Sequence, residues 1–152
     1  MMIAFARTHN SVTTPTRSNP SDAGLDVFFC PVDGNPVEIA PNTCKLLGTG
    51  VKMEIPHGYM MQVCNRSGIA SKRSLVVGAH IIDSGYSGEI LINLHNIGDK
   101  VQVINAGDKI AQLVMLPILV PRLAEVDIND LYTEPVTISN RESGGFGSTG
   151  NR

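Results

Sequence analysis

The sequence predicts an all-β fold: a sandwich, a jelly roll or a small barrel. Two observations support this prediction. Short runs rich in Val, Ile, Leu and Met alternate with clusters of Gly, Pro, Asn and Asp, which is the pattern of strands and turns. No stretch repeats its apolar residues with the period of a long helix, and only RSGIASKR at 66–73 is briefly helical.

The expected strands are short, as in most β-sandwiches and barrels. They are LDVFF, GTGVKMEIP, GYMMQVC, SLVV, GEILINLHN, KVQVI and KIAQLVMLP, which occupy residues 25–29, 48–56, 58–64, 74–77, 88–96, 100–104 and 109–117.

Two of these strands show how the sheets should be buried. In 88–96 the side chains of Ile90, Ile92 and Leu94 share one face, so that strand should be half-buried. The run 109–117 is apolar on both faces except at Gln112, which predicts a central or interface strand. A polar amide in such a strand needs a functional or structural reason.

Length and composition indicate one globular domain. The chain has 152 residues, of which 42% are hydrophobic and 17% charged. No apolar run is long enough for a membrane span and the N-terminal stretch does not resemble a secretory peptide, so we expect a soluble, cytoplasmic protein. The net charge of -2 and the lack of a basic stripe argue against a nucleic-acid partner. Scattered cysteines and histidines predict neither a disulfide framework nor a protein metal cage.

The stretch IIDSGYSGEI, residues 81–90, carries an acid beside an aromatic ring. Two glycines flank Tyr86, which predicts a hairpin with Asp83 on one arm. An acid at a strand end is commonly a turn former. Beside an aromatic residue, it is also a candidate for activating a small polar ligand.

A second candidate site is NRSGIAS, where Arg66, Ser67 and Gly68 stand at the start of the short helix. An arginine and a hydroxyl beside helix N-terminal amides suit a phosphate. The alternative is that Ser67 is simply an N-cap. Asp26 is a charge inside an apolar strand, so it should accept buried hydrogen bonds or face a site.

These pieces together resemble a known family. In order, AGLD at 23–26, RSGIA at 66–70, IIDSGYSGEI at 81–90, GDKIAQLV at 107–114 and RESGGFGSTG at 141–150 are similar to the five motifs of the trimeric dUTPases. The resemblance covers nearly the whole chain.

The resemblance implies a distorted jelly-roll β-barrel that assembles as a homotrimer with active sites at the subunit interfaces. It implies a core domain at 1–120, an extended connector at 121–140 and a flexible Gly-rich arm at 141–152 that closes a site. The implied reaction converts dUTP and water to dUMP and pyrophosphate, with Mg²⁺ carried on the triphosphate. On composition alone the arm would be a disordered terminus.

The resemblance also assigns roles to individual residues. Asp83 would be the general base that activates the water attacking the α-phosphorus, and Tyr86 would pack on the deoxyribose and exclude a 2′-hydroxyl. Backbone groups between about Gly78 and Tyr86 would read uracil. Asp26 would order water around the metal or hold the barrel. The implied substrate contacts are Arg66, Ser67, Gly68, Gly78, Ile82, Tyr86, Gln112, Arg141, Phe146, Gly147, Ser148 and Thr149.

The chain departs from the family pattern at a few positions. Asn65 stands where Pro is usual, Ala79 and His80 stand where the motif usually runs into Gly, and Gly85 replaces a common acid. The asparagine often found near the start of that loop is missing, which leaves Val77 and Gly78. These departures bear on how uracil is recognised.

Two rival functions follow from the same residues. The Ala-His pair before Ile-Asp also resembles the related dCTP deaminases, which carry a catalytic Glu where this chain has Asn93 and which lack the glycine-rich tail. A nucleotide-gated regulatory binding protein that uses the tail as its switch is the second rival.

Overall fold

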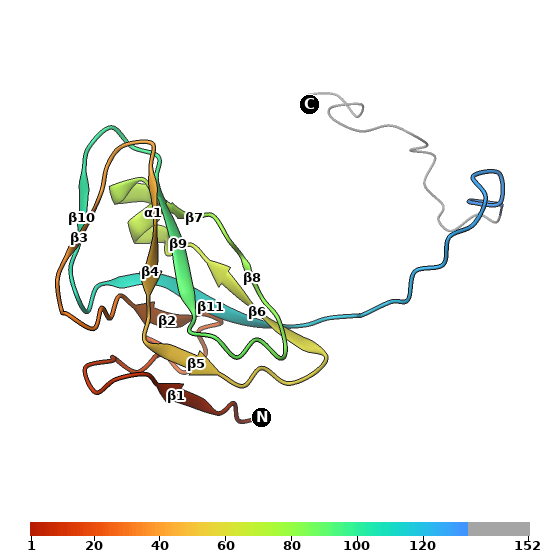
Figure 1. Cartoon of the computed structure of the whole chain (residues 1–152), viewed down its shortest axis with the longest axis horizontal. Helices are drawn as coiled ribbons and strands as arrows, with labels where there is room; N and C mark the ends of the chain where they lie inside the picture. Colours follow the sequence, from red (N-terminus) through yellow and green to blue (C-terminus); the bar gives the residue numbers. More distant parts are fainter. Residues whose placement is uncertain (134–152) are drawn as a thin grey trace. The chain divides into compact units, whose positions relative to one another are not determined.

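The computed structural model describes residues 1–133 of the chain, and the residues that follow lie outside the description. The described part is all-β apart from one short helix (Figure 1). Its elements are β1 (Phe5–Arg7), β2 (Leu25–Phe28), β3 (Val37–Ile39), β4 (Cys44–Gly48), β5 (Val51–Met53), β6 (Tyr59–Cys64), α1 (Ser67–Arg73), β7 (Leu75–Val77), β8 (Ile81–Ile82), β9 (Leu91–Asn96), β10 (Gln102–Ile104) and β11 (Lys109–Pro117).

The described strands form four antiparallel sheets. The largest has the order β2-β11-β6-β8, the next has the order β4-β9-β7, and β1-β5 and β10-β3 are two-stranded. The sequence-based prediction that 109–117 is a central strand is confirmed, because β11 lies between β2 and β6. Each of these sheets is open, so the described strands do not form a closed barrel.

The core draws buried side chains from all four sheets. Ile90, Ile92 and Leu94 are each at most 1% exposed, as their alternation predicted, and they pack with Leu113 and Leu47. Apolar side chains on one face of each strand therefore hold the sheets together, because burying such a side chain stabilises the fold by about 1.5–3 kcal/mol.

The hairpin predicted for 81–90 is wrong. β8 pairs with β6, and β9 pairs with β4 and β7, so the two arms belong to different sheets. Only the turn is as expected: the amide of Tyr86 donates to the carbonyl of Asp83 at 3.3 Å, and Gly85 has φ of 83°. A local turn can bend the chain without fixing which strands pair.

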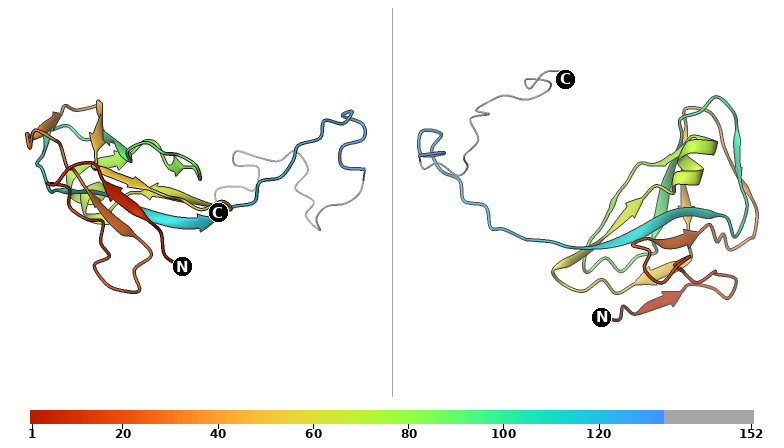
Figure 2. Two further views of the ribbon diagram at one scale, coloured as in Figure 1. Left: turned by 60° about the horizontal axis from the view of Figure 1, so that its bottom comes forward. Right: turned by 180° about the vertical axis from the view of Figure 1, so that it is seen from behind.

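The N-terminal compact unit covers Met1–Val120. Two further views show this unit from other directions, with α1 at one end of it beside β7 (Figure 2). Residues 121–133 contain neither strand nor helix, and Leu123 and Ile128 there are 96% and 76% exposed. No helix within the described part of the chain could span a membrane.

Candidate active site

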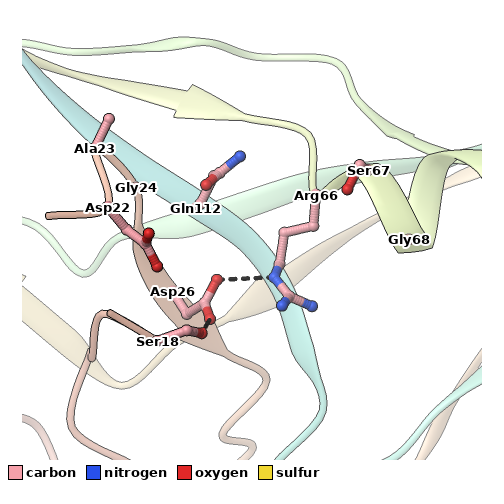
Figure 3. A pocket seen from close by; sticks show the side chains of 9 residues that line it. All are labelled: Ser18, Asp22, Ala23, Gly24, Asp26, Arg66, Ser67, Gly68 and Gln112. Atoms are coloured by element: carbon pink, nitrogen blue, oxygen red, sulfur yellow. Dashed lines mark hydrogen bonds and ion pairs between the residues drawn. The ribbon is translucent and has the colours of Figure 1, made fainter. Parts of the chain in front are cut away.

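A cleft of about 560 Å³ lies where three of the sequence motifs meet (Figure 3). One wall comes from β2 and the loop before it, another from the start of α1, and the third from β11. The structure thus brings together five residues singled out from the sequence. The full lining is Ser18, Asp22, Ala23, Gly24, Asp26, Arg66, Ser67, Gly68 and Gln112.

Asp26 is the centre of this cleft, and its surroundings explain a charge inside an apolar strand. The residue is 6% exposed. Its Oδ1 accepts a hydrogen bond from Nε of Arg66 at 2.8 Å. Its Oδ2 lies 2.8 Å from Nζ of Lys109 and accepts from the hydroxyl of Ser18 at 3.4 Å. Two cations therefore compensate the buried carboxylate, which would otherwise be costly.

The ion pairs also determine the protonation of Asp26. Burial raises the pKa of this carboxyl, but hydrogen bonds from Lys109 and Arg66 and the charges of both lower it, and the net pKa lies below the ordinary value of 3.8. Asp26 is therefore ionised near neutral pH.

A pH-dependent stability follows from this lowered pKa. Ionised Asp26 stabilises the fold above pH 3.8, and this contribution is lost as the pH falls through the lower folded pKa. Urea unfolding measured between about pH 5 and pH 2 at fixed protein concentration should lose stability steeply, and Asp26→Asn should flatten that loss. Equal pH dependence in the two proteins would show that Asp26 is not coupled to folding.

Arg66 and Ser67 present donors to the cleft. Arg66 occupies the N-cap position of α1 in extended geometry, with φ of -91° and ψ of 127°, and its side chain makes no capping bond. Its Nε is held by Asp26 instead. Ser67 is the first helical residue, so its interpretation as an N-cap is wrong. Among the described residues, neither the Ser67 hydroxyl nor the terminal guanidinium nitrogens of Arg66 facing the cleft have a hydrogen-bond partner there.

The side chain of Gln112 occupies the space beside Gly24. Gln112 lies opposite Asp26 in the β11–β2 register, and a Cβ on Gly24 would collide with its side-chain oxygen. The amide nitrogen of Gln112 donates to the carbonyl of Asn65 at 2.8 Å. The glycine is therefore needed so that the glutamine can cross the cleft beside Arg66.

The other candidate residues lie elsewhere in the chain. Gly78, Ile82, Asp83 and Tyr86 do not line the cleft. Asp83 is exposed, and Tyr86 is 46% exposed with its hydroxyl donating to the carbonyl of Glu89 at 2.9 Å. Within one chain, Arg66 lies in the cleft with Asp26, Ser67, Gly68 and Gln112, whereas Gly78, Ile82, Asp83 and Tyr86 lie outside it. Arg141, Phe146, Gly147, Ser148 and Thr149 lie outside the described residues.

Sequence reasoning missed two contributors to the cleft that matter chemically. Lys109 helps Arg66 to compensate the negative charge of Asp26, and Gly24 leaves room for the side chain of Gln112. Both residues stand inside the motifs AGLD and GDKIAQLV. An acid in one apolar strand and a lysine at the start of another are the signal by which the pair could have been found.

The cleft and the fold define a class of protein. An all-β domain with a polar cleft that offers a fixed guanidinium, a hydroxyl and an amide is suited to phosphate groups, and the volume is in the range of ligand pockets. These features define a small all-β domain with a polar cleft whose donors suit an anionic ligand.

The chain belongs to the dUTPase family, whose model matches residues 10–150. The deoxyuridine 5'-triphosphate nucleotidohydrolase of Gloeobacter violaceus is 39% identical over 97% of this chain and 96% of its own. A solved dUTPase of Staphylococcus bacteriophage 80alpha, with dUpNHpp, is 28% identical with a TM-score of 0.83 over 98% of each chain. A variant dUTPase from phage phi11 of S. aureus, in which a structural Mg(II) ion is coordinated, is 29% identical with a TM-score of 0.76 and covers 84% of this chain and 97% of that chain.

Proposed function

We propose that this chain is a dUTP diphosphatase, which hydrolyses dUTP to dUMP and pyrophosphate. The observation that carries the proposal is the family match over residues 10–150, which spans all five motifs. The cleft adds a physical reason, because it joins Asp26, Arg66 and Gln112 from three separate motifs in one polar site.

We propose that the complete site forms between copies in a homotrimer of jelly-roll domains. The reason is that the Arg66 cleft and the Asp83 loop lie apart in one chain. In a closed symmetric trimer, the same two surfaces of neighbouring copies meet three times. Each site then takes its phosphate contacts from the Arg66 cleft of one copy and its general base, Asp83, from another copy. The arm at 141–152 closes over the site.

In the proposed mechanism, Arg66, Ser67 and Gln112 hold the phosphates and Asp83 accepts the proton of the attacking water. A carboxylate suits this role because its oxygens can accept a proton and orient a water in line with the α-phosphorus. The proton passes from water to Asp83 as the new P–O bond forms and pyrophosphate leaves. Arg66 stabilises the charge that develops on the phosphate oxygens.

Mg²⁺ is the proposed cofactor, and bound to the triphosphate it would neutralise charge and orient the phosphates. The described residues contain no group of three or more His, Cys, Asp or Glu that could hold a metal. Both carboxylate oxygens of Asp26 already face cations, so this residue would reach Mg²⁺ through water. The donor set therefore fits a metal that is carried mainly by the substrate.

The rival deaminase reaction requires a group that takes a proton from water at position 93. Asn93 has an amide there, which cannot act as a base.

The second rival function is that of a regulatory binding protein. The dUTPase of bacteriophage 80alpha is described as controlling transfer of virulence genes. For this chain, hydrolysis is the function that the motifs support.

A nucleotide panel tests the proposal. Purified protein with Mg²⁺ is incubated with dUTP, dCTP, dTTP and UTP, and pyrophosphate and ammonia are both measured. We expect pyrophosphate from dUTP and almost none from the others. Equal turnover of dUTP and dCTP, or release of ammonia from dCTP, would overturn the proposal.

Tyr86→Ala should weaken the preference for dUTP over UTP. In the proposed site the ring packs on the deoxyribose and leaves no room for a 2′-hydroxyl, and a contact of this kind is worth about tenfold to two hundredfold in discrimination. The measurement is the ratio of kcat/KM for the two nucleotides. An unchanged ratio would place the 2′ selection on another residue.

A further inference from the structure

The loop at 77–82 is tied to the end of β6 by two side chains. The amide of Val63 donates to the carbonyl of His80 at 2.8 Å, and Nδ1 of His80 lies 2.9 Å from the carbonyl of Val63. Because a carbonyl only accepts, Nδ1 carries the proton in this contact. The side-chain oxygen of Asn65 accepts from the amide of Val77 at 2.7 Å.

These side-chain bonds add to main-chain bonds of the loop, such as the one from the amide of Gly78 to the carbonyl of Asn93 at 2.9 Å. β8 contains only two residues and pairs at the edge of its sheet. Gly78, Ala79 and His80 are all exposed, so burial contributes little to their position. A short edge strand with exposed flanking residues opens easily unless further bonds fix it.

Asn65 also touches the Arg66 cleft of its own chain. Its carbonyl accepts the amide of Gln112 at 2.8 Å, and the next residue is Arg66. One residue therefore contacts the phosphate cleft through its main chain and the loop through its side chain. Its position links the cleft to the loop by direct hydrogen bonds.

We propose that Asn65 and His80 are positioning residues that fix the loop at 77–82 in its base-binding conformation before substrate arrives. The inference rests on the proposed function, in which the backbone of this loop reads uracil. Both residues act here through their side chains, so each of these two bonds can be removed by substitution. A preformed loop lowers the entropy lost on binding, and it should affect substrate affinity rather than the chemical step.

The test uses the full-length protein with Asn65→Ala, His80→Ala and the conservative Asn65→Asp, which keeps an acceptor oxygen. The controls Asn10→Ala and Lys45→Ala alter exposed residues that line neither the cleft nor the pocket beside Tyr86. KM and kcat are measured for dUTP, and inorganic triphosphate serves as a competitive inhibitor that has no base.

We expect each alanine variant in the tether to raise KM for dUTP about fivefold, the worth of one hydrogen bond, with kcat within about twofold. Inhibition by triphosphate should be unchanged, because the phosphate cleft stays intact. Asn65→Asp and both controls should behave as wild type. An unchanged KM in both alanine variants, a loss confined to kcat, or an equal weakening of triphosphate inhibition would each overturn the proposal.

Amide hydrogen exchange tests the tether without relying on catalysis. Exchange in residues 75–82 should become faster in Asn65→Ala and in His80→Ala, and it should stay slow in the controls. Unchanged exchange would contradict the tether. A wild-type protein that fails to hydrolyse dUTP would contradict the proposed function instead.

Discussion

Asp83→Asn should lower kcat for dUTP by about 10³-fold while leaving nucleotide binding close to wild type. The amide has nearly the shape of the carboxylate, so the loop should keep its turn, but it cannot accept the proton of the attacking water. Asp83 is exposed in the single chain, which leaves it free to face a partner's cleft. The measurement is steady-state hydrolysis of dUTP, with the affinity for dUpNHpp determined by titration calorimetry.

The matched control is Asp99→Asn, which alters an exposed acid outside the candidate site. It should retain full activity. If Asp83→Asn stayed within about tenfold of wild type, the loss would be too small for a general base and another group must activate the water.

Asp26→Asn should lower both stability and activity. The substitution removes the charge that holds Nε of Arg66 and Nζ of Lys109, each 2.8 Å away. Both cations are partly exposed, so solvent will compensate them in part, and we expect a loss of about 2 kcal/mol in the free energy of unfolding. Arg66 would also lose its fixed orientation toward the phosphates, which should reduce kcat/KM about 10²-fold.

Lys109→Met separates the effect of Asp26 on stability from its effect on the orientation of Arg66. It removes one cation from the carboxylate but leaves the contact to Arg66, so stability should fall with a smaller loss of activity. If Asp26→Asn had the wild-type free energy of unfolding and kept full activity, the orientation of Arg66 would not depend on this ion pair.

The parts of the fold that could be predicted from sequence are those with strong local patterns. β9 and β11 have clear apolar patterns, and both were expected at nearly their observed positions. β1, β3 and β4 were missed because they are short and each of them buries at most one side chain. Leu46 in β4 is 65% exposed and Phe5 in β1 is 46% exposed, so neither strand alternates cleanly.

The candidate site was predictable in its residue types and less so in its geometry. Asp26 and Gln112 were conspicuous because a polar group in an apolar strand must be satisfied, and both are. The partner Lys109 and the pairing of β8 with β6 depend on contacts between distant segments, which local patterns do not encode. The separation of Asp83 from Arg66 likewise became visible only in three dimensions.

Subunit mixing tests most directly the claim that the site forms between copies. Asp83→Asn and Arg66→Ala proteins, each nearly inactive, are unfolded together in equal amounts and refolded. The account predicts that dUTP hydrolysis returns, with about a quarter of the sites taking an intact Asp83 and an intact Arg66 from different copies. A mixture that stays as inactive as its two components would contradict the account, because both residues would then have to come from the same chain.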